Sequence, residues 1–317
     1  MKLTVALDWT PNVIHSGMYL AQLKGYFPAD LSVTFISTDI DNYTKSPIER
    51  LADGEADIAL GPTEHLLKYQ MLKDDAFPVV AIATVMQEET SGFVTLASSG
   101  VDRPAQLDGQ TYAGYQTILE ESLLKSMICQ DGGEGDIQMI TPLRLEIFEA
   151  FLRGEFDVCW VFSPWEGVIA QHRGIALKTF RLTDYQVPYG YSPLIMTREA
   201  VLREQPNNIR SFLAAIARGY QEISQQPGAM AQQLVEGVDH ANFTDAALIT
   251  QALNAISPTL LDPQGQWGTM QPSYSERYVR WLLQHNLLTT ESDRTLTIQD
   301  IAVDQLFVNQ YLPQTSR

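Results

Sequence analysis

Strand-like and helix-like segments alternate through the first 90 residues, and this alternation constrains the fold more than any other feature of the chain. Short apolar runs typical of buried strands are separated by segments with helical spacing. Strands joined by helices of this length form βαβ units, which give a parallel sheet with right-handed crossovers. The expected strands are residues 3–7, 31–37, 57–60 and 78–85, and the expected helices are 15–25, 46–53 and 63–72.

A second series of the same kind begins near Gln110. Its expected strands are residues 111–114, 137–140 and 157–162, and its expected helices are 119–129 and 143–152. Residues 51–60 and 151–160 also match: each reads as a helix end, a Gly-Glu turn and a buried strand opened by Asp. The match predicts two lobes of similar build, although Gly-Glu-x-Asp is also a common connection between a helix and a strand.

The domain organisation follows from the length and from the last third of the chain. Because 317 residues exceed the usual size of one core, two lobes are expected. Residues 92–97 and 187–197 are extended and are interpreted as paired crossovers at which the lobes would hinge. The first lobe would comprise residues 1–91 and a helical tail, 198–317, and the second lobe residues 92–197. Each lobe is expected to be a mostly parallel sheet flanked by helices.

The charge balance and the cysteines exclude several classes of protein. A net charge of −17 argues against nucleic acid and against an anionic membrane surface. No apolar run approaches the roughly 20 residues that cross a bilayer. Without a signal-peptide pattern, the expected location is cytoplasmic, or periplasmic or extracellular if an export signal has been removed. Cys129 and Cys159 lie in apolar runs and are expected to be buried; the protein is expected to be a monomer.

The motifs of common catalytic sites are missing from the sequence. There is no phosphate-binding Gly-rich loop, no Gly-x-Ser-x-Gly turn, and no metal-ligand spacing among the five histidines. No cofactor, metal or catalytic residue is therefore expected, and ligand binding is favoured over turnover.

Polar and aromatic residues follow the expected strands, where the ligands of open α/β sheets bind. Their aromatic faces suit a flat ring, and a buried carboxylate such as Glu166 suits an amino-substituted heterocycle. We expect them to line a cleft between the lobes. These candidates are Trp9, Asn12, Pro62, Thr63, His65, Tyr115, Gln116, Thr117, Trp165, Glu166, Tyr189 and Tyr191.

Each candidate also has a purely structural interpretation. Trp9, Trp160 and Trp165 can fill the core, as aromatic residues commonly do. His65 can cap a helix or pack in the core. Glu64 and Glu166 can be surface carboxylates near helix N-termini, and Tyr189 and Tyr191 can pack at the hinge.

Three blocks of sequence resemble one known family. They are Asp8-Trp9-Thr10-Pro11-Asn12 with His15 and residues 19–27, Gly54-Glu55-Ala56-Asp57, and Val187-Pro188-Tyr189-Gly190-Tyr191. The family joins the fungal thiamine-pyrimidine synthases to bacterial solute-binding proteins for thiamine-pyrimidine precursors. The resemblance implies the type II periplasmic-binding-protein fold of ABC transporter substrate-binding proteins. It also implies that Trp9 stacks on a pyrimidine-like ring, that Asp8 or Glu166 accepts from its amino group, and that His15 belongs to the site.

The chain departs from the synthases at three places. The synthases carry a pyridoxal phosphate lysine after the third strand, where this chain has Leu60-Gly61-Pro62-Thr63, although His65 is kept. Residues 114–118 replace the phosphate loop, and residues 189–192 replace the cysteine cluster. The resemblance therefore implies a solute-binding protein with an ABC permease as its partner if exported. The alternatives are a thiamine-pyrimidine biosynthesis enzyme using His65, and an alkanesulfonate or other organic-anion binder, which the acidic balance disfavours.

Overall fold

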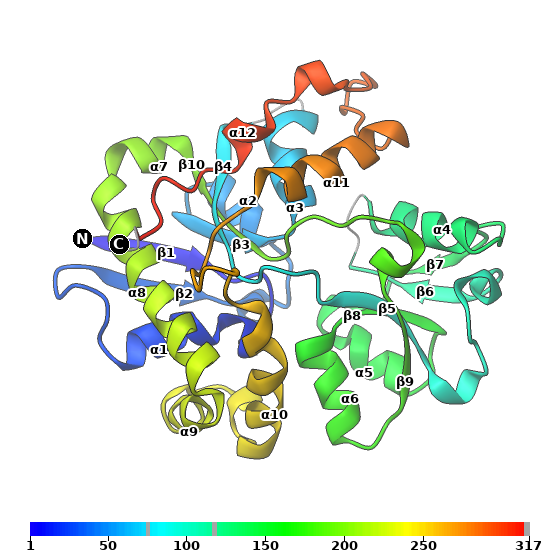
Figure 1. The fold of residues 1–317 in the computed structure, drawn as a ribbon, viewed down its shortest axis with the longest axis horizontal. Helices are drawn as coiled ribbons and strands as arrows, with labels where there is room; N and C mark the ends of the chain where they lie inside the picture. The colour runs from blue at the N-terminus through cyan, green and yellow to red at the C-terminus, as the bar shows by residue number, and fades with distance from the viewer. Residues whose placement is uncertain (74–76, 116–118, 314–317) are drawn as a thin grey trace. The chain divides into compact units, whose positions relative to one another are not determined.

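The chain divides into two compact units, each built around one sheet. The computed structural model describes residues 1–73, 77–115 and 119–313. The first unit comprises Met1–Glu89 and Gly190–Arg317, and the second comprises Thr90–Tyr189 (Figure 1). The predicted α/β class is confirmed, because each unit is a five-stranded, mostly parallel sheet with flanking helices.

The sheet of the first unit has the strand order β2-β1-β3-β10-β4. Strand β1 pairs in parallel with β2 and β3, and β10 is antiparallel to both of its neighbours. All six residues of β4 and all four of β3 are buried, as expected for a sheet covered on both faces. The strands are β1 (Lys2–Ala6), β2 (Ser32–Ile36), β3 (Ile58–Gly61), β4 (Val79–Thr84) and β10 (Leu194–Arg198).

The sheet of the second unit repeats this arrangement, with the order β7-β6-β8-β5-β9. Strand β6 is parallel to β7 and β8, while β5 is antiparallel to β8 and β9. One antiparallel strand thus holds the fourth place in both sheets. The strands are β5 (Ser91–Leu96), β6 (Thr111–Ala113), β7 (Gln138–Ile140), β8 (Val158–Phe162) and β9 (Leu177–Phe180), and the helices are α4 (Glu120–Gln130), α5 (Ile147–Leu152) and α6 (Val168–His172).

The two segments interpreted as crossovers contribute these antiparallel strands. Residues 92–97 largely form β5 of the second sheet, and residues 194–198 form β10 between β3 and β4 of the first. The division between the units therefore lies after Tyr189 rather than after residue 197. Apolar, β-branched residues predict an extended segment, but they do not say which sheet it joins.

The matching segments 51–60 and 151–160 have the same geometry in both units. Gly54 and Gly154 end a helix with φ values of 76° and 75°. The aspartate three residues after each glycine reaches across to the neighbouring strand. Asp57 Oδ2 accepts from the Thr4 amide at 2.8 Å, and Asp157 Oδ2 accepts from the Thr111 amide at 2.9 Å. The aspartate at the start of each strand thus fixes its register against the adjacent parallel strand.

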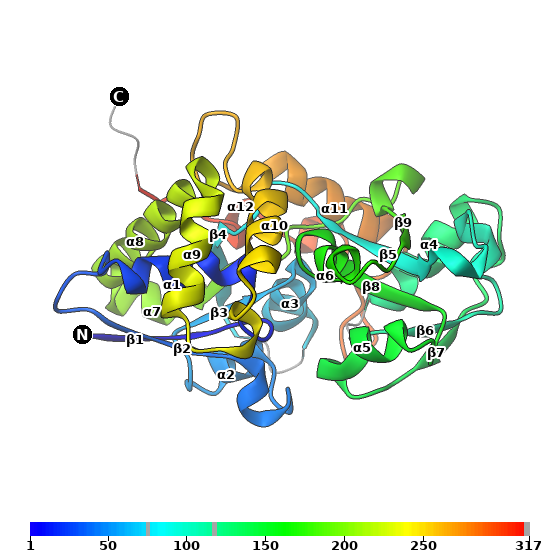
Figure 2. The ribbon, with the colours of Figure 1, turned by 90° about the horizontal axis from the view of Figure 1, so that it is seen from below.

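The helices of the first unit cover its sheet. Helices α1, α8, α9 and α10 pack against one another on one side (Figures 1 and 2), and α2 and α3 contact the strands. The predicted helical tail is confirmed by α8 to α11. The helices are α1 (Ser16–Leu23), α2 (Pro47–Ala52), α3 (Thr63–Leu67), α7 (Glu199–Glu204), α8 (Pro206–Gln225), α9 (Pro227–Gly237), α10 (Ala246–Ile256), α11 (Pro272–Gln284) and α12 (Val303–Leu306).

One expectation about the cysteines is wrong. Cys159 is fully buried in β8, but Cys129 is exposed near the end of α4. The buried face of α4 carries residues 123, 124, 127 and 128, and Cys129 lies outside it. An apolar neighbourhood in sequence does not fix the side of a helix on which a residue falls.

Helix α1 lies unusually close to α8 because both contain glycine at the contact. A Cβ atom added to Gly219 would lie 2.2 Å from the carbonyl oxygen of Gly17. A Cβ atom added to Gly17 would lie 2.4 Å from the ring of Tyr220. Neither position accepts a side chain unless a helix or the Tyr220 ring shifts.

We expect Gly219→Ala to lower the free energy of unfolding by about 1–3 kcal/mol, the usual cost of overpacking a core. Denaturant unfolding followed by circular dichroism measures this change. Gly228→Ala is the matched control, because a Cβ atom at Gly228 in α9 meets nothing within 4 Å and alanine favours a helix. Equal stability of the two variants would show that the contact between α1 and α8 tolerates a methyl group.

Candidate functional site

The loop after β1 is fixed by a buried asparagine. Asn12 is 1% exposed and caps the helical turn Val13–His15, and its side-chain oxygen accepts from the Ile14 amide at 2.8 Å. Its side-chain nitrogen donates to the Thr10 carbonyl at 3.0 Å. These bonds hold the polypeptide between the strand and α1 in one conformation.

Asp8, at the start of this loop, is hydrogen-bonded to His15, in the turn that follows it. His15 is fully buried, and its Nε2 lies 2.7 Å from Oδ1 of Asp8, whose side chain is 17% exposed. The backbone N–H of Asn12 donates to the other ring nitrogen, Nδ1, at 3.3 Å. Nδ1 therefore accepts, so that the ring proton is on Nε2 and is donated to Asp8. The carboxylate stands where β1 ends, held from behind by a buried imidazole.

Trp9 is half-buried beside Asp8. Its ring lies 5.7 Å from that of Tyr43 at an interplanar angle of 53°. Tyr43 has a left-handed backbone, with φ of 60°, and follows Asn42, whose φ is 53°. The indole is thus supported by an aromatic partner without being enclosed in the core.

Thr63 and Tyr191 serve the architecture of the first unit. The amide and the hydroxyl of Thr63 both donate to the Tyr191 carbonyl, at 3.1 and 2.9 Å. The Tyr191 hydroxyl accepts from the Gln271 amide at 2.9 Å, and its ring stacks on Tyr274 at 4.5 Å. A Cβ atom at Gly190 would lie 2.5 Å from the Thr63 hydroxyl oxygen. These contacts tie the returning chain to the start of α3.

The neighbours of Thr63 also pack closely. Pro62 precedes the first turn of α3, and the His65 ring lies against Gly61, where a Cβ atom would be 2.9 Å from Nδ1. Glu64 is 1% exposed, so its interpretation as a surface carboxylate is wrong. Burial, and after it the Glu64 carboxylate, raise the pKa of the Tyr278 hydroxyl well above its usual value.

In the second unit, a carboxylate that the sequence did not single out organises the end of β6. Glu120 is 2% exposed, and its Oε1 accepts from the Tyr115 amide at 3.1 Å and from the Tyr112 hydroxyl. The Tyr115 hydroxyl donates to the Trp160 carbonyl at 3.2 Å. The glycine at position 114 was the available sequence signal for a close neighbour. In the structure, a Cβ atom there would lie 2.8 Å from Glu120 Oε2. Gln116 and Thr117 lie outside the described residues.

Trp165 and Glu166 follow β8, and Tyr189 lies at the end of the second unit. Glu166 is 6% exposed, which corrects its surface interpretation, and its Oε2 accepts from the Phe162 amide at 3.0 Å. Trp165 and Tyr189 are both 4% exposed. The Tyr189 ring lies 5.1 Å from that of Trp160, which packs in the core against Phe93, as expected.

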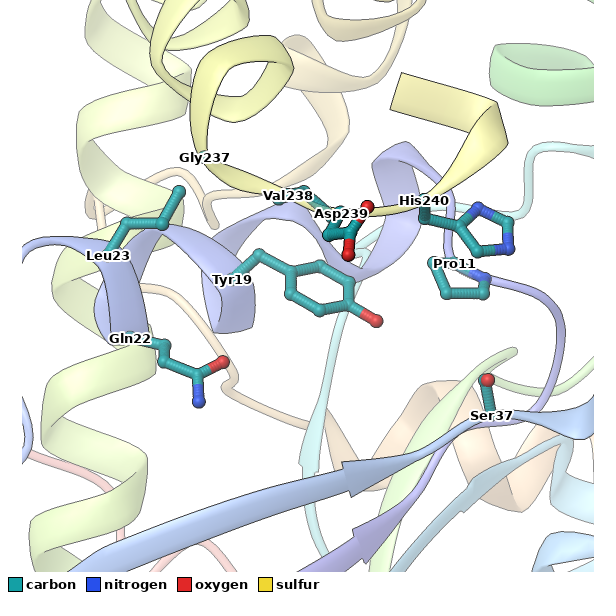
Figure 3. Close-up of a pocket in the computed structure, with 9 residues that line it drawn as sticks. All are labelled: Pro11, Tyr19, Gln22, Leu23, Ser37, Gly237, Val238, Asp239 and His240. Carbon is teal, nitrogen blue, oxygen red and sulfur yellow. The ribbon is translucent and has the colours of Figure 1, made fainter. Parts of the chain in front are cut away.

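A separate pocket of about 350 Å³ lies on the first unit, and Pro11 is the one residue of the Asp8–Asn12 loop among those that line it (Figure 3). His240 at its rim donates from Nε2 to Asp39 at 3.0 Å, because Nδ1 accepts from the Asn242 amide. The pocket is lined by Pro11, Tyr19, Gln22, Leu23, Ser37, Gly237, Val238, Asp239 and His240.

Asn242 braces the same loop from outside. Its side-chain nitrogen donates to the Pro11 carbonyl at 2.8 Å and to the Thr10 hydroxyl at 3.2 Å. Asn242 begins an Asn-Phe-Thr sequence, but the nitrogen that would carry a glycan is used for these bonds. Asn242 lies 231 positions after Pro11 and 232 after Thr10, so only the fold brings them together.

Over residues 1–73, 77–115 and 119–313, no group of His, Cys, Asp and Glu side chains has the arrangement of a metal site. In those same ranges, none of the helices combines the length and the apolar character needed to span a bilayer.

Solved structures define the class of the fold. The periplasmic aliphatic sulphonate binding protein of Escherichia coli superimposes with a TM-score of 0.66 at 15% identity, covering 100% of this chain and 94% of that chain. A Candida albicans protein described as having the generic periplasmic binding protein fold gives a TM-score of 0.56 at 14% identity, covering 86% and 98%. The chain has a periplasmic-binding-protein fold.

Sequence comparison identifies the family. The NMT1/THI5-like family model matches residues 12–230, and the chain belongs to this family. A formylaminopyrimidine-binding protein of Halalkalibacterium halodurans is 27% identical over 290 residues, covering 90% of this chain and 85% of that protein. A 4-amino-5-hydroxymethyl-2-methylpyrimidine phosphate synthase of Aspergillus parasiticus is 20% identical over 308 residues, covering 89% and 88%. The family resemblance predicted from the sequence is confirmed.

The two thiols are expected to differ in reactivity. Burial, and after it the carboxylates of Glu166 and Glu120, raise the pKa of Cys159 well above its usual value, so that this thiol stays protonated at neutral pH. Titration of the native protein with a disulfide reagent should give one fast thiol, Cys129, and a second only after denaturation. Cys129→Ser is the control, and a fast thiol remaining in that variant would contradict the prediction.

Proposed function

We propose that the protein is a solute-binding protein for a small planar nitrogen heterocycle, a thiamine-pyrimidine precursor or a close analogue. The observation that carries this proposal is the placement of Asp8 beside Trp9 at the end of β1. An aromatic face next to a hydrogen-bond acceptor suits a flat ring with an exocyclic amino group. The similarity to a formylaminopyrimidine-binding protein supports the same class of ligand.

The proposal assigns roles to a subset of the candidates. Trp9 stacks on the ring and Asp8 accepts from its amino group, while Asn12 holds their loop. Thr63 and Tyr191 are left out, because their polar groups bond within the first unit. In the second unit, Tyr115, Trp165, Glu166 and Tyr189 remain proposed ligand residues. Hinge closure of the two units and an ABC permease partner, if the protein is exported, belong to the same proposal.

Two alternatives are less well supported. The residues at the end of β3 do not fit attachment of pyridoxal phosphate, because Gly61, Pro62 and Thr63 supply no amine and both donors of Thr63 are used. This favours binding over the synthase reaction that other relatives perform. An organic-anion ligand is disfavoured because Asp8 would place a carboxylate next to it.

A ligand screen tests the proposal. We expect 4-amino-5-hydroxymethyl-2-methylpyrimidine and formylaminopyrimidine to raise the melting temperature, since a ligand at 100 times its dissociation constant stabilises by about 2.7 kcal/mol. Alkanesulfonates serve as the control ligands of the same fold. Stabilisation by a sulfonate with none by either pyrimidine would contradict the proposal.

The stacking role of Trp9 gives a second test. We expect Trp9→Ala to weaken pyrimidine binding by about 10- to 100-fold in calorimetry, because stacking of a base on an aromatic side chain is worth about 1–3 kcal/mol. Trp9→Phe keeps an aromatic face and should retain most of the affinity. An unchanged dissociation constant in Trp9→Ala would exclude Trp9 as the stacking platform.

A further inference from the structure

We propose that His15 determines the specificity of the site for an exocyclic amino group by holding Asp8 as an oriented hydrogen-bond acceptor. This inference rests on the proposed function, in which Asp8 receives that amino group. His15 is fully buried and does not itself meet the ligand, so that it is a positioning residue.

The hydrogen bonds of the His15 ring determine which of its nitrogens carries the proton. The backbone N–H of Asn12 can only donate a hydrogen bond, and it lies 3.3 Å from Nδ1 of His15. Nδ1 must therefore be the acceptor and Nε2 must carry the proton. Nε2 donates this proton to Asp8 Oδ1 at 2.7 Å. The backbone of the loop thus selects the tautomer that pins the carboxylate.

The turn that carries His15 is anchored to helix α8. The carbonyl of Ile14, the residue before His15, accepts from the Tyr220 hydroxyl of α8 at 2.8 Å. Tyr220 is fully buried and stacks on Trp267 at 4.8 Å. The turn that carries His15 is therefore attached to the core helix of the unit, and the imidazole cannot follow a rotation of the Asp8 side chain.

The oriented carboxylate of Asp8 determines which ligand groups the proposed site accepts. An ionised carboxylate has only acceptor atoms, and His15 fixes the orientation of this one. A ligand that donates from an amino group completes the arrangement. A ligand with a methyl group in the same place leaves the carboxylate desolvated without a donor, which is costly.

A second His-Asp pair in the same unit supplies a matched control. His240 also accepts at Nδ1 from a backbone amide, that of Asn242, and donates from Nε2 to Asp39. Asparagine at either position can still accept from the backbone amide but is too short to reach the carboxylate. His15→Asn and His240→Asn therefore remove the same contact from two different aspartates.

The experiment compares two probes by calorimetry. One is 4-amino-5-hydroxymethyl-2-methylpyrimidine, and the other carries a methyl group in place of the amino group. We expect the unmodified protein to prefer the amino probe by about 10- to 100-fold, the value of a hydrogen bond to a charged group. His15→Asn should reduce this preference at least about fivefold, whereas His240→Asn should leave it unchanged.

Two further variants separate positioning from a general structural effect. His15→Gln places an amide donor where Nε2 stands, and it should keep the preference within about twofold of the original. Adding His15→Asn to Asp8→Asn should change the preference no further, because His15 acts through Asp8. In the unmodified protein, nitrogen-15 NMR of His15 should show the Nε2–H tautomer, whether or not the variants fold.

The outcomes distinguish the two proposals. If the amino probe does not bind, the proposed function and this inference both fail. If it binds but His15→Asn keeps the full preference, or His15→Gln loses as much as His15→Asn, the inference fails and the proposed function stands. An Nδ1–H tautomer would also overturn the inference.

Discussion

Helix α1 lies directly on α8 because glycine stands on both sides of their contact, and the candidate site depends on this approach. Gly219 is followed by Tyr220, whose hydroxyl reaches back to the Ile14 carbonyl. The turn before α1 is thereby held in place, and His15 within it orients Asp8. The close packing of two helix backbones in the core therefore positions one carboxylate at the end of the sheet, through the hydrogen bonds from Tyr220 to Ile14 and from His15 to Asp8.

The two units use one plan at the amino edge of each sheet and different chemistry at the carboxyl edge. Asp57 and Asp157 fix neighbouring strands in the same way. Beyond the strands, the first unit offers a partly exposed aspartate beside a half-buried indole, while the second has the buried Glu120 and Glu166. Similar frames therefore leave the ends of the strands open to diverge, as expected of a fold whose function resides in its loops.

Local pattern was enough to predict the parallel strands and their helices. It failed where the decisive partner is distant in sequence. The Thr63 hydroxyl donates to the Tyr191 carbonyl, 128 residues away in sequence. The Asn242 side chain donates to the Pro11 carbonyl in the loop after β1. The burial of Glu64 was missed for the same reason, since a helix start looks alike in sequence whether solvent or another element covers it. The antiparallel course of β10 likewise depends on the sheet it enters, not on its own residues.

The pairing of β4 with β10 has a consequence for how such a chain can change. The chain leaves the first unit just after β4 and re-enters it just before β10, and Thr84 is paired with Leu194 at that point. The Val85 amide also donates to the Pro193 carbonyl at 3.1 Å. Exit and entry are thus adjacent on the same sheet, which is the geometry of a tolerated domain insertion. Residues 90–189 form a cassette that can be exchanged for another of different chemistry while the frame that receives it keeps its own hydrogen bonds.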